Sequence, residues 1–187
     1  FADTLFIADK QTAGVGRRGR SWESPEGENI YMSLLLKPDI EPSKAPMLTL
    51  VMAVAVAQGI RDVWLKKMGN LPICSHSEGA IARDCDDKAD VNNILQIQIK
   101  WPNDIIINKK KVCGILTEMA MDGTAIKYVI IGVGINVNQK ELVPELKDKA
   151  TSLLLENLAV QDRKFDREAI IAAVLEEFYK YYDGFLR

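Results

Sequence analysis

The sequence predicts an α+β fold, with a mixed, largely antiparallel sheet and helices packed mainly on one face. Short apolar runs joined by tight turns follow one another after residue 104, which favours antiparallel pairing. Two segments, 45–66 and 166–183, have the length and pattern of helices. A chain of 187 residues with 48% hydrophobic content is long enough for one core, so we assign residues 1–187 to a single domain.

The first half of the chain is expected to supply two strands and one long helix. Residues 4–8 and 29–37 are the predicted strands, and the second is nearly all apolar, which is typical of a central strand. Residues 45–66 are apolar around most of the helix circumference, so we expect burial on several sides. Ser43 is a possible N-cap for this helix.

Residues 69–93 differ in character, because they are polar and acidic and contain glycine and proline. We interpret them as an inserted loop. Cys74, His76 and Cys85 are possible metal ligands, but no fourth ligand is evident and the spacing matches no common zinc pattern. An exposed loop with incidental cysteines is the favoured interpretation.

The second half begins with residues 95–99, whose alternation predicts a strand that Pro102 ends. The runs 105–108 and 111–112 then flank a turn at 109–110, which predicts a hairpin.

A second hairpin is predicted between residues 114–121 and 125–137, because Asp122-Gly123 is a strong turn signal. Gly132 and Gly134 inside the latter strand indicate either close approach of a ligand or a sheet bulge.

The last predicted helix, 166–183, is amphipathic, with Asp166 as its expected cap. One face carries apolar and aromatic residues at three- and four-residue spacing. We assign them to the core rather than to a cofactor site: Ile171, Val174, Leu175, Phe178 and Tyr182.

Composition narrows the functional classes. A net charge of −2 gives no electrostatic footprint for nucleic acid. Three cysteines without a repeated Cys-x-x-Cys spacing fit reduced thiols in a cytoplasmic protein. We expect no membrane span, since Gln58 and Arg61 interrupt the most apolar run, and no signal peptide opens the chain. Because the first residue is Phe1, we interpret the chain as a fragment or a processed form.

The motif Lys-Trp-Pro-Asn-Asp at 100–104 places a lysine at the end of a predicted strand, beside a turn that Pro102 stiffens. A cation held in this way suits a fixed anion. The alternative is a surface charge at a strand end.

A second candidate site is the stretch 11–20, Gln-Thr-Ala-Gly-Val-Gly-Arg-Arg-Gly-Arg. Its glycines let the backbone approach a ligand and line up amides toward an anion. Its arginines add planar donors that match phosphate or carboxylate oxygens. The stretch is neither a Walker A loop nor a dinucleotide fingerprint. From the arginines alone, a solvated basic turn is the favoured interpretation.

Together, however, several blocks resemble the biotin protein ligases (biotin–[acetyl-CoA-carboxylase] ligases) in the same order. They are the glycine–arginine loop with its continuation to Tyr31, the motif 100–104, Lys111–Glu118, Gly132–Asn138 and the weaker block Ala150–Leu153. The resemblance covers roughly residues 3–155 and implies the α+β catalytic domain of that family.

The resemblance implies two half-reactions. Biotin and ATP give biotinyl-5′-AMP and pyrophosphate, with Mg²⁺ bound mainly through phosphate oxygens and waters. A lysine of the biotin carboxyl-carrier domain of a carboxylase then displaces AMP. The first step brings a carboxylate against a triphosphate, and one unit-charge pair at about 4 Å costs about 4 kcal/mol at an effective dielectric near 20. Lys100 is the predicted cation that removes this cost.

Carried over residue by residue, the resemblance assigns the following groups. Lys100 and Arg17 are expected in catalysis. Substrate binding is assigned to Gln11, Gly14, Val15, Gly16, Arg17, Lys100, Gly114 and Leu116. Nucleotide binding is assigned to Arg17, Arg18, Arg20, Trp22, Asn103 and Asn136. Trp22 resembles the ring that packs on adenine, with a core tryptophan as its alternative. Asp104 is either a metal ligand or a cap of the turn.

The chain also departs from this family. Val15 stands where a basic residue is common, and the insertion 69–93 replaces a shorter connection. The Ser/Thr-rich motif before the first strand, the small barrel after the last helix and a helix-turn-helix segment are absent from these 187 residues. The alternatives are a lipoate or octanoate ligase or transferase of the same fold, or a non-catalytic biotin- or nucleotide-binding remnant. A homodimer formed by sheet extension is a further possibility that the resemblance implies.

Overall fold

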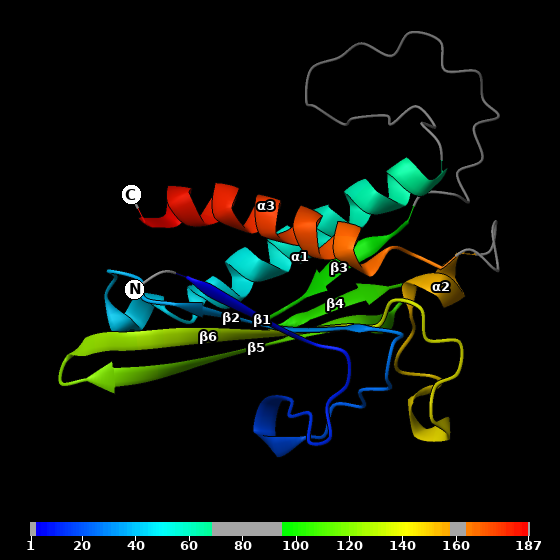
Figure 1. The fold of residues 1–187 in the computed structure, drawn as a ribbon, viewed down its shortest axis with the longest axis horizontal. Helices are drawn as coiled ribbons and strands as arrows, with labels where there is room; N and C mark the ends of the chain where they lie inside the picture. Colours follow the sequence, from blue (N-terminus) through cyan, green and yellow to red (C-terminus); the bar gives the residue numbers. More distant parts are fainter. Residues whose placement is uncertain (1–2, 69–94, 158–163, 187) are drawn as a thin grey trace, which may run out of the picture.

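The computed structural model describes residues 3–68, 95–157 and 164–186, which form one open sheet covered by helices (Figure 1). The sheet has six strands in the order β1-β2-β6-β5-β4-β3, and each neighbouring pair of these strands is antiparallel. The strands are β1 (Thr4–Ala8), β2 (Ile30–Leu36), β3 (Ile97–Lys100), β4 (Asp104–Ile107), β5 (Lys110–Asp122) and β6 (Ala125–Ile135). The predicted α+β class is confirmed, and the described strands pair without any parallel neighbour.

Two long helices, α1 (Met47–Met68) and α3 (Arg167–Leu186), lie side by side on one face of the sheet. Gly59 allows their close approach, because a Cβ at this position would lie 2.8 Å from the backbone nitrogen of Val174. The Oδ1 atom of Asp166 accepts hydrogen bonds from two amides in the first turn of α3, as predicted. The expectation that helices cover mainly one face is confirmed.

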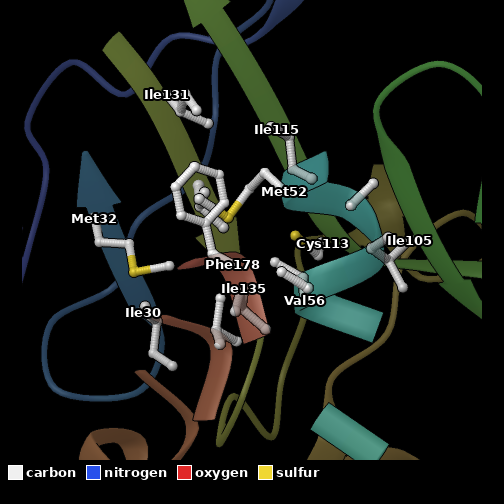
Figure 2. Close-up of a cluster of buried hydrophobic side chains, with 14 of the residues drawn as sticks. Ile30, Met32, Met52, Val56, Ile105, Cys113, Ile115, Ile131, Ile135 and Phe178 are labelled. Carbon is white, nitrogen blue, oxygen red and sulfur yellow. The ribbon is translucent and has the colours of Figure 1, made fainter. Parts of the chain in front are cut away.

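The core lies between this helix pair and the sheet, as Figure 2 shows. Met52 and Val56 of α1 and Phe178 of α3 point toward the strands and are fully buried. Ile115 of β5 and Ile135 of β6 meet them from the sheet, with 2% and 0% of their surface exposed. Apolar side chains fill the space between the helix pair and these strands, so the core itself leaves no place for a polar ligand.

Short helical turns join the larger elements: η1 (Arg17–Gly19), η2 (Pro42–Lys44), η4 (Pro144–Leu146) and α2 (Leu153–Glu156). Two local predictions need correction. Ser43 lies inside the η2 turn and does not cap the long helix. The β4–β5 turn falls at Asn108 and Lys109, whose φ angles of 49° and 68° reverse the chain one residue earlier than predicted. The insertion 69–93, with Cys74, His76 and Cys85, lies outside the described residues.

One helix corrects the statement that no apolar run is long enough to cross a membrane, although not the expectation that the chain has no membrane span. The segment Pro42–Lys67 is long enough and, with a mean hydropathy of 1.5, apolar enough to cross a membrane by composition. Many of its apolar residues, among them Leu48, Met52 and Val56, are buried in the core with α3 and the sheet. Since a buried core helix has the same composition, the segment is accounted for by the fold.

Candidate active site

At the centre of the sheet face opposite α1 and α3, two glycines form a strip that carries no side chains of its own. Gly114 of β5 and Gly134 of β6 are partners across the two strands, and the indole ring of Trp22 lies on both. A Cβ at Gly134 would lie 2.6 Å from Cε2 of the ring, and one at Gly114 would lie 2.8 Å from Cζ3. Side chains at these two positions would therefore push the ring off the sheet.

The glycine–arginine loop that carries this ring lies below the sheet in Figure 1, on the side away from α1 and α3. The loop folds back on itself: the amide of Gly16 donates to the carbonyl of Arg20 at 2.6 Å, and that of Trp22 donates to the carbonyl of Gly14 at 2.8 Å. At its tip, Arg18 adopts a φ of 60°. These backbone bonds fix the base of the loop and leave its arginine side chains exposed.

A first cavity of about 380 Å³ lies between this loop and strands β2, β5 and β6. Leu116, Ile130 and Val133 give it an apolar surface, whereas Gln11 and Arg17 supply polar groups. The size and lining suit a small organic molecule with one charged end.

A second cavity of about 430 Å³ lies on the other side of Trp22. Asn136 lies in its wall and is held there by a hydrogen bond from its Nδ2 to the carbonyl of Thr151, at 3.0 Å. Two carboxylates line the cavity, Glu23 and Asp104. Five cationic side chains outnumber them: Arg17, Arg18, Arg20, Lys111 and Lys149. Such an excess of positive charge attracts a polyanion such as a triphosphate.

Arg17 and Asn103 stand where the two cavities meet, since both residues line both cavities. The Arg17 guanidinium donates a hydrogen bond to Oδ1 of Asn103 at 3.0 Å. Asn103 is 9% exposed, and its Nδ2 donates to the carbonyl of Ile115 at 3.1 Å. Strand β5 thus holds the side-chain amide of Asn103, and this amide orients Arg17 where the two cavities meet.

Lys111 is the second cation at this boundary. Its Nζ lies 2.7 Å from Oδ1 of Asp104 and 5.1 Å from the centroid of the Trp22 ring. It also lies close to the glycine strip, because a Cβ at Gly114 would be 3.0 Å from Nζ. The ion pair with Asp104 and the contact with the ring hold the ammonium in the wall that the two cavities share.

Lys100 lies at the rim of this site, because it pairs with Asp104, which pairs in turn with Gly114, so all three residues share the cavity face of the sheet. It is exposed on the edge strand β3 and lines neither cavity. Within the described ranges it forms no hydrogen bond or ion pair. The catalytic role of Lys100 therefore stays a prediction, and Lys111 is a second lysine that lies in the wall shared by the two cavities.

The other predicted residues are largely brought together. Gln11, Val15, Gly16, Gly114 and Leu116 line the first cavity, and Arg18, Arg20, Asp104 and Asn136 line the second. Trp22, Arg17 and Asn103 line both. Gly14 stands behind the loop, where a side chain would collide with the carbonyl oxygen of Trp22. This packing by itself requires a glycine here, and the predicted contact of Gly14 with a substrate stays a prediction.

Sequence reasoning missed Lys111 as a site residue, although this lysine opens one of the quoted blocks. Strict alternation along β5 would turn Lys111 to the same face as the buried Cys113. The register shifts here: Ile105 faces Cys113, whereas Ile106 faces Lys111. This bulge turns Lys111 to the cavity face, and alternation alone contains no signal for it.

Neither of two buried acids near the site is available as a base. Burial raises the pKa of Tyr31 to about 12, and its hydroxyl donates to the carbonyl of Pro25 at 2.9 Å. Burial likewise raises the pKa of the Cys113 thiol well above its ordinary value. Both groups stay protonated near neutral pH, so neither accepts a proton in the reaction.

The described residues contain no cluster of three or more His, Cys, Asp or Glu side chains that could hold a metal ion. Asp104 is the predicted ligand, and its carboxylate is paired with Lys111. Mg²⁺ that arrives with a nucleotide is held mainly by phosphate oxygens and waters, so it does not require such a cluster.

Comparison with known proteins agrees with this geometry. Residues 2–136 match the sequence profile of the Biotin/lipoate A/B protein ligase family. The chain is 43% identical over 185 residues to "Bifunctional ligase/repressor BirA" of Bacillus subtilis, covering 98% of this chain and 47% of that protein. It is 32% identical over 131 residues to "Biotin--[acetyl-CoA-carboxylase] ligase" of Paracoccus denitrificans, covering 70% of this chain and 43% of that protein. The chain thus spans about half the length of these curated relatives.

Among solved structures, a biotin protein ligase from Aquifex aeolicus in complex with biotin and ATP is similar, with a TM-score of 0.69 and 31% identity over 97% of this chain and 61% of that one. A biotin protein ligase from Leishmania major in complex with biotinyl-5-AMP gives a TM-score of 0.63 and 28% identity over 96% of this chain and 64% of that one.

Proposed function

We propose that this chain, which belongs to the biotin/lipoate A/B protein ligase family, joins biotin to ATP as biotinyl-5′-AMP and then passes biotin to a lysine of a carrier protein. The observation that carries this proposal is the meeting of two cavities at a wall that holds Arg17 and Lys111. A similar solved structure is described as a complex with both biotin and ATP, which supports the same pairing of ligands.

In this proposal biotin occupies the first cavity. Its bicyclic ring system would lie on the apolar surface around Leu116, and its carboxylate would point toward Arg17. ATP occupies the second cavity, with its phosphates among the arginines of the loop and Lys149. The carboxylate oxygen and the α-phosphorus then meet beside the boundary wall.

The chemistry needs positive charge at that meeting point. The carboxylate oxygen attacks the α-phosphorus, a new P–O bond forms, and pyrophosphate leaves with the electron pair of the broken bond. Repulsion of one anion pair at about 4 Å costs about 4 kcal/mol at an effective dielectric near 20. Two fixed cations between the reactants reverse the sign of this local field. We assign this role to Arg17 and Lys111, which line the wall, while the role of Lys100 stays a prediction.

The acceptor we propose is the biotin carboxyl-carrier domain of a carboxylase, as the name of the Paracoccus relative suggests for that protein. We also propose a cytoplasmic location, on the ground that the cysteine pattern fits reduced thiols. The predictions of a homodimer and of no nucleic-acid partner remain predictions. The Bacillus relative carries "repressor" in its name, and this chain covers 47% of it.

Isotope exchange between labelled pyrophosphate and ATP tests the first half-reaction. We expect exchange that depends on added biotin. The family also includes lipoate ligases, so the same assay with lipoate or octanoate is the matched comparison. If exchange depends on lipoate or octanoate instead, that acid and not biotin is the substrate. Absence of exchange with intact biotin binding would reduce the chain to a binding module.

A further inference from the structure

A third cavity of about 350 Å³ adjoins the other two. It lies between the start of α1, the turn that precedes β4, and β5, and Met47, Leu50 and Trp101 contribute to its wall. Arg17 and Asn103 line this cavity as well as the first and the second. The three cavities therefore converge on one hydrogen-bonded pair of side chains.

The third cavity differs from the others in its chemistry. No carboxylate is found among the described residues that line it, and Arg17 is the charged group there. Its mouth is apolar and accessible, since Trp101 is 76% exposed and Met47 is 50% exposed. A tryptophan this exposed beside a reaction site is a typical anchor for a partner protein.

We infer that this third cavity admits the acceptor lysine of the carrier protein during the second half-reaction, an inference that rests on the proposed function. With biotin in the first cavity and AMP in the second, the mixed anhydride lies at the junction beside Arg17. The third cavity is the approach that remains to the same point. Trp101 and Met47 at its mouth contact the carrier surface around that lysine.

The bond changes fit this approach. The lysine nitrogen attacks the carboxyl carbon, a C–N bond forms, and the bond between that carbon and the oxygen that bridges to phosphorus breaks. The electron pair leaves with AMP, and the amine gives a proton to solvent. Attack needs the neutral amine, whereas a free lysine has a pKa near 10.4. Apolar walls and a neighbouring guanidinium both disfavour the ammonium form, so the cavity promotes the reactive state.

Trp101→Ala tests the docking role. Transfer from preformed biotinyl-5′-AMP to a recombinant biotin-acceptor domain should slow about tenfold or more, the effect of losing an aromatic anchor at an interface. Biotin-dependent pyrophosphate exchange should stay within about twofold, as should reaction of the bound adenylate with hydroxylamine, which needs no docking. Tyr181→Ala is the matched control, because this aromatic side chain is also exposed and lies on α3, away from the site.

Normal transfer by the Trp101 variant would overturn the inference. So would an equal loss of exchange and transfer, since Trp101 would then belong to the site of the first half-reaction. If the unaltered chain shows no biotin-dependent exchange, the proposed function itself fails. The two failures are thus distinguishable.

A second variant pair tests the charge argument. Thr49 lines the third cavity, and Thr49→Asp and Thr49→Asn differ there by one negative charge. The carboxylate should stabilise the lysine ammonium and move the pH profile of transfer about one unit to higher pH relative to the asparagine variant. Coincident profiles from two folded, active variants would contradict the entry of lysine through this cavity.

Discussion

At the scale of single residues, two lysines separate the sequence-based prediction from the geometry. Lys111→Ala should slow biotin-dependent adenylate formation by about thirtyfold, because it removes one of two cations that together offset a repulsion of about 4 kcal/mol. Lys100→Ala should change the rate by about threefold at most, since an exposed charge of this kind is screened. Rapid-quench measurement of the first turnover checks both values.

Unchanged melting temperatures of both variants would serve as the control for folding. A large loss in the Lys100 variant, with little change in the Lys111 variant, would restore the role predicted from the motif 100–104. A loss in both would indicate that the turn after β3 positions the whole boundary wall.

Residue chemistry at the glycine–arginine loop was predictable because it depends on local sequence. Three glycines and three arginines in ten residues predict an anion site wherever the loop lies. The position of Trp22 was not predictable from local sequence. Its two interpretations, a ring that packs on adenine and a core tryptophan, differ only in what lies beneath the ring. The structure places it on Gly114 and Gly134, two positions that are distant in sequence from the loop.

At the scale of elements, the contact between α1 and α3 sets how the core closes over the sheet. Gly59→Ala should raise the free energy of unfolding by about 0.5–1 kcal/mol through helix propensity. Overpacking should lower the same free energy by about 1–3 kcal/mol, because the new methyl group would lie 2.8 Å from the backbone nitrogen of Val174. The larger effect wins, so we expect net destabilisation, measured by urea unfolding.

Gly184→Ala is the matched control on α3, where a new Cβ has nothing within 4 Å. This variant should be more stable than the parent by about 0.5–1 kcal/mol, since only the propensity term remains. Stabilisation by Gly59→Ala of the same size would mean that the two helices yield without cost and that their close contact has no energetic consequence.

Most elements were predictable because their signals are short-range. Residues 4–8 are a strand as predicted, and the Asp122-Gly123 turn joins β5 and β6, with Gly123 at a φ of 61°. What failed was set by neighbouring elements. The bulge in β5 depends on how β4 pairs with it, and Ser43 lost its capping role because the η2 turn precedes the helix. Neither effect is contained in a single segment.

At the scale of the whole molecule, packed tyrosines link folding to alkaline pH. Burial raises the pKa of both Tyr31 and Tyr182 from 10 to about 12, and these residues lie on opposite sides of the sheet, one in the wall of the first cavity and one in the core. A raised pKa in the folded state means that the folded chain keeps protons that the unfolded chain has lost. The stability from this source is complete below about pH 10 and is lost as the pH rises toward about 12.

The free energy of unfolding should therefore fall between pH 10 and 12, as measured by urea unfolding at a series of pH values. Tyr182→Phe removes one of these protons and should make the fall shallower. Tyr181→Phe deletes an exposed hydroxyl one position away and should leave the slope at its parent value. An unchanged slope in the Tyr182 variant would mean that its hydroxyl ionises without unfolding the core. In that case the packing of α3 on the sheet would be looser than its buried aromatic cluster indicates.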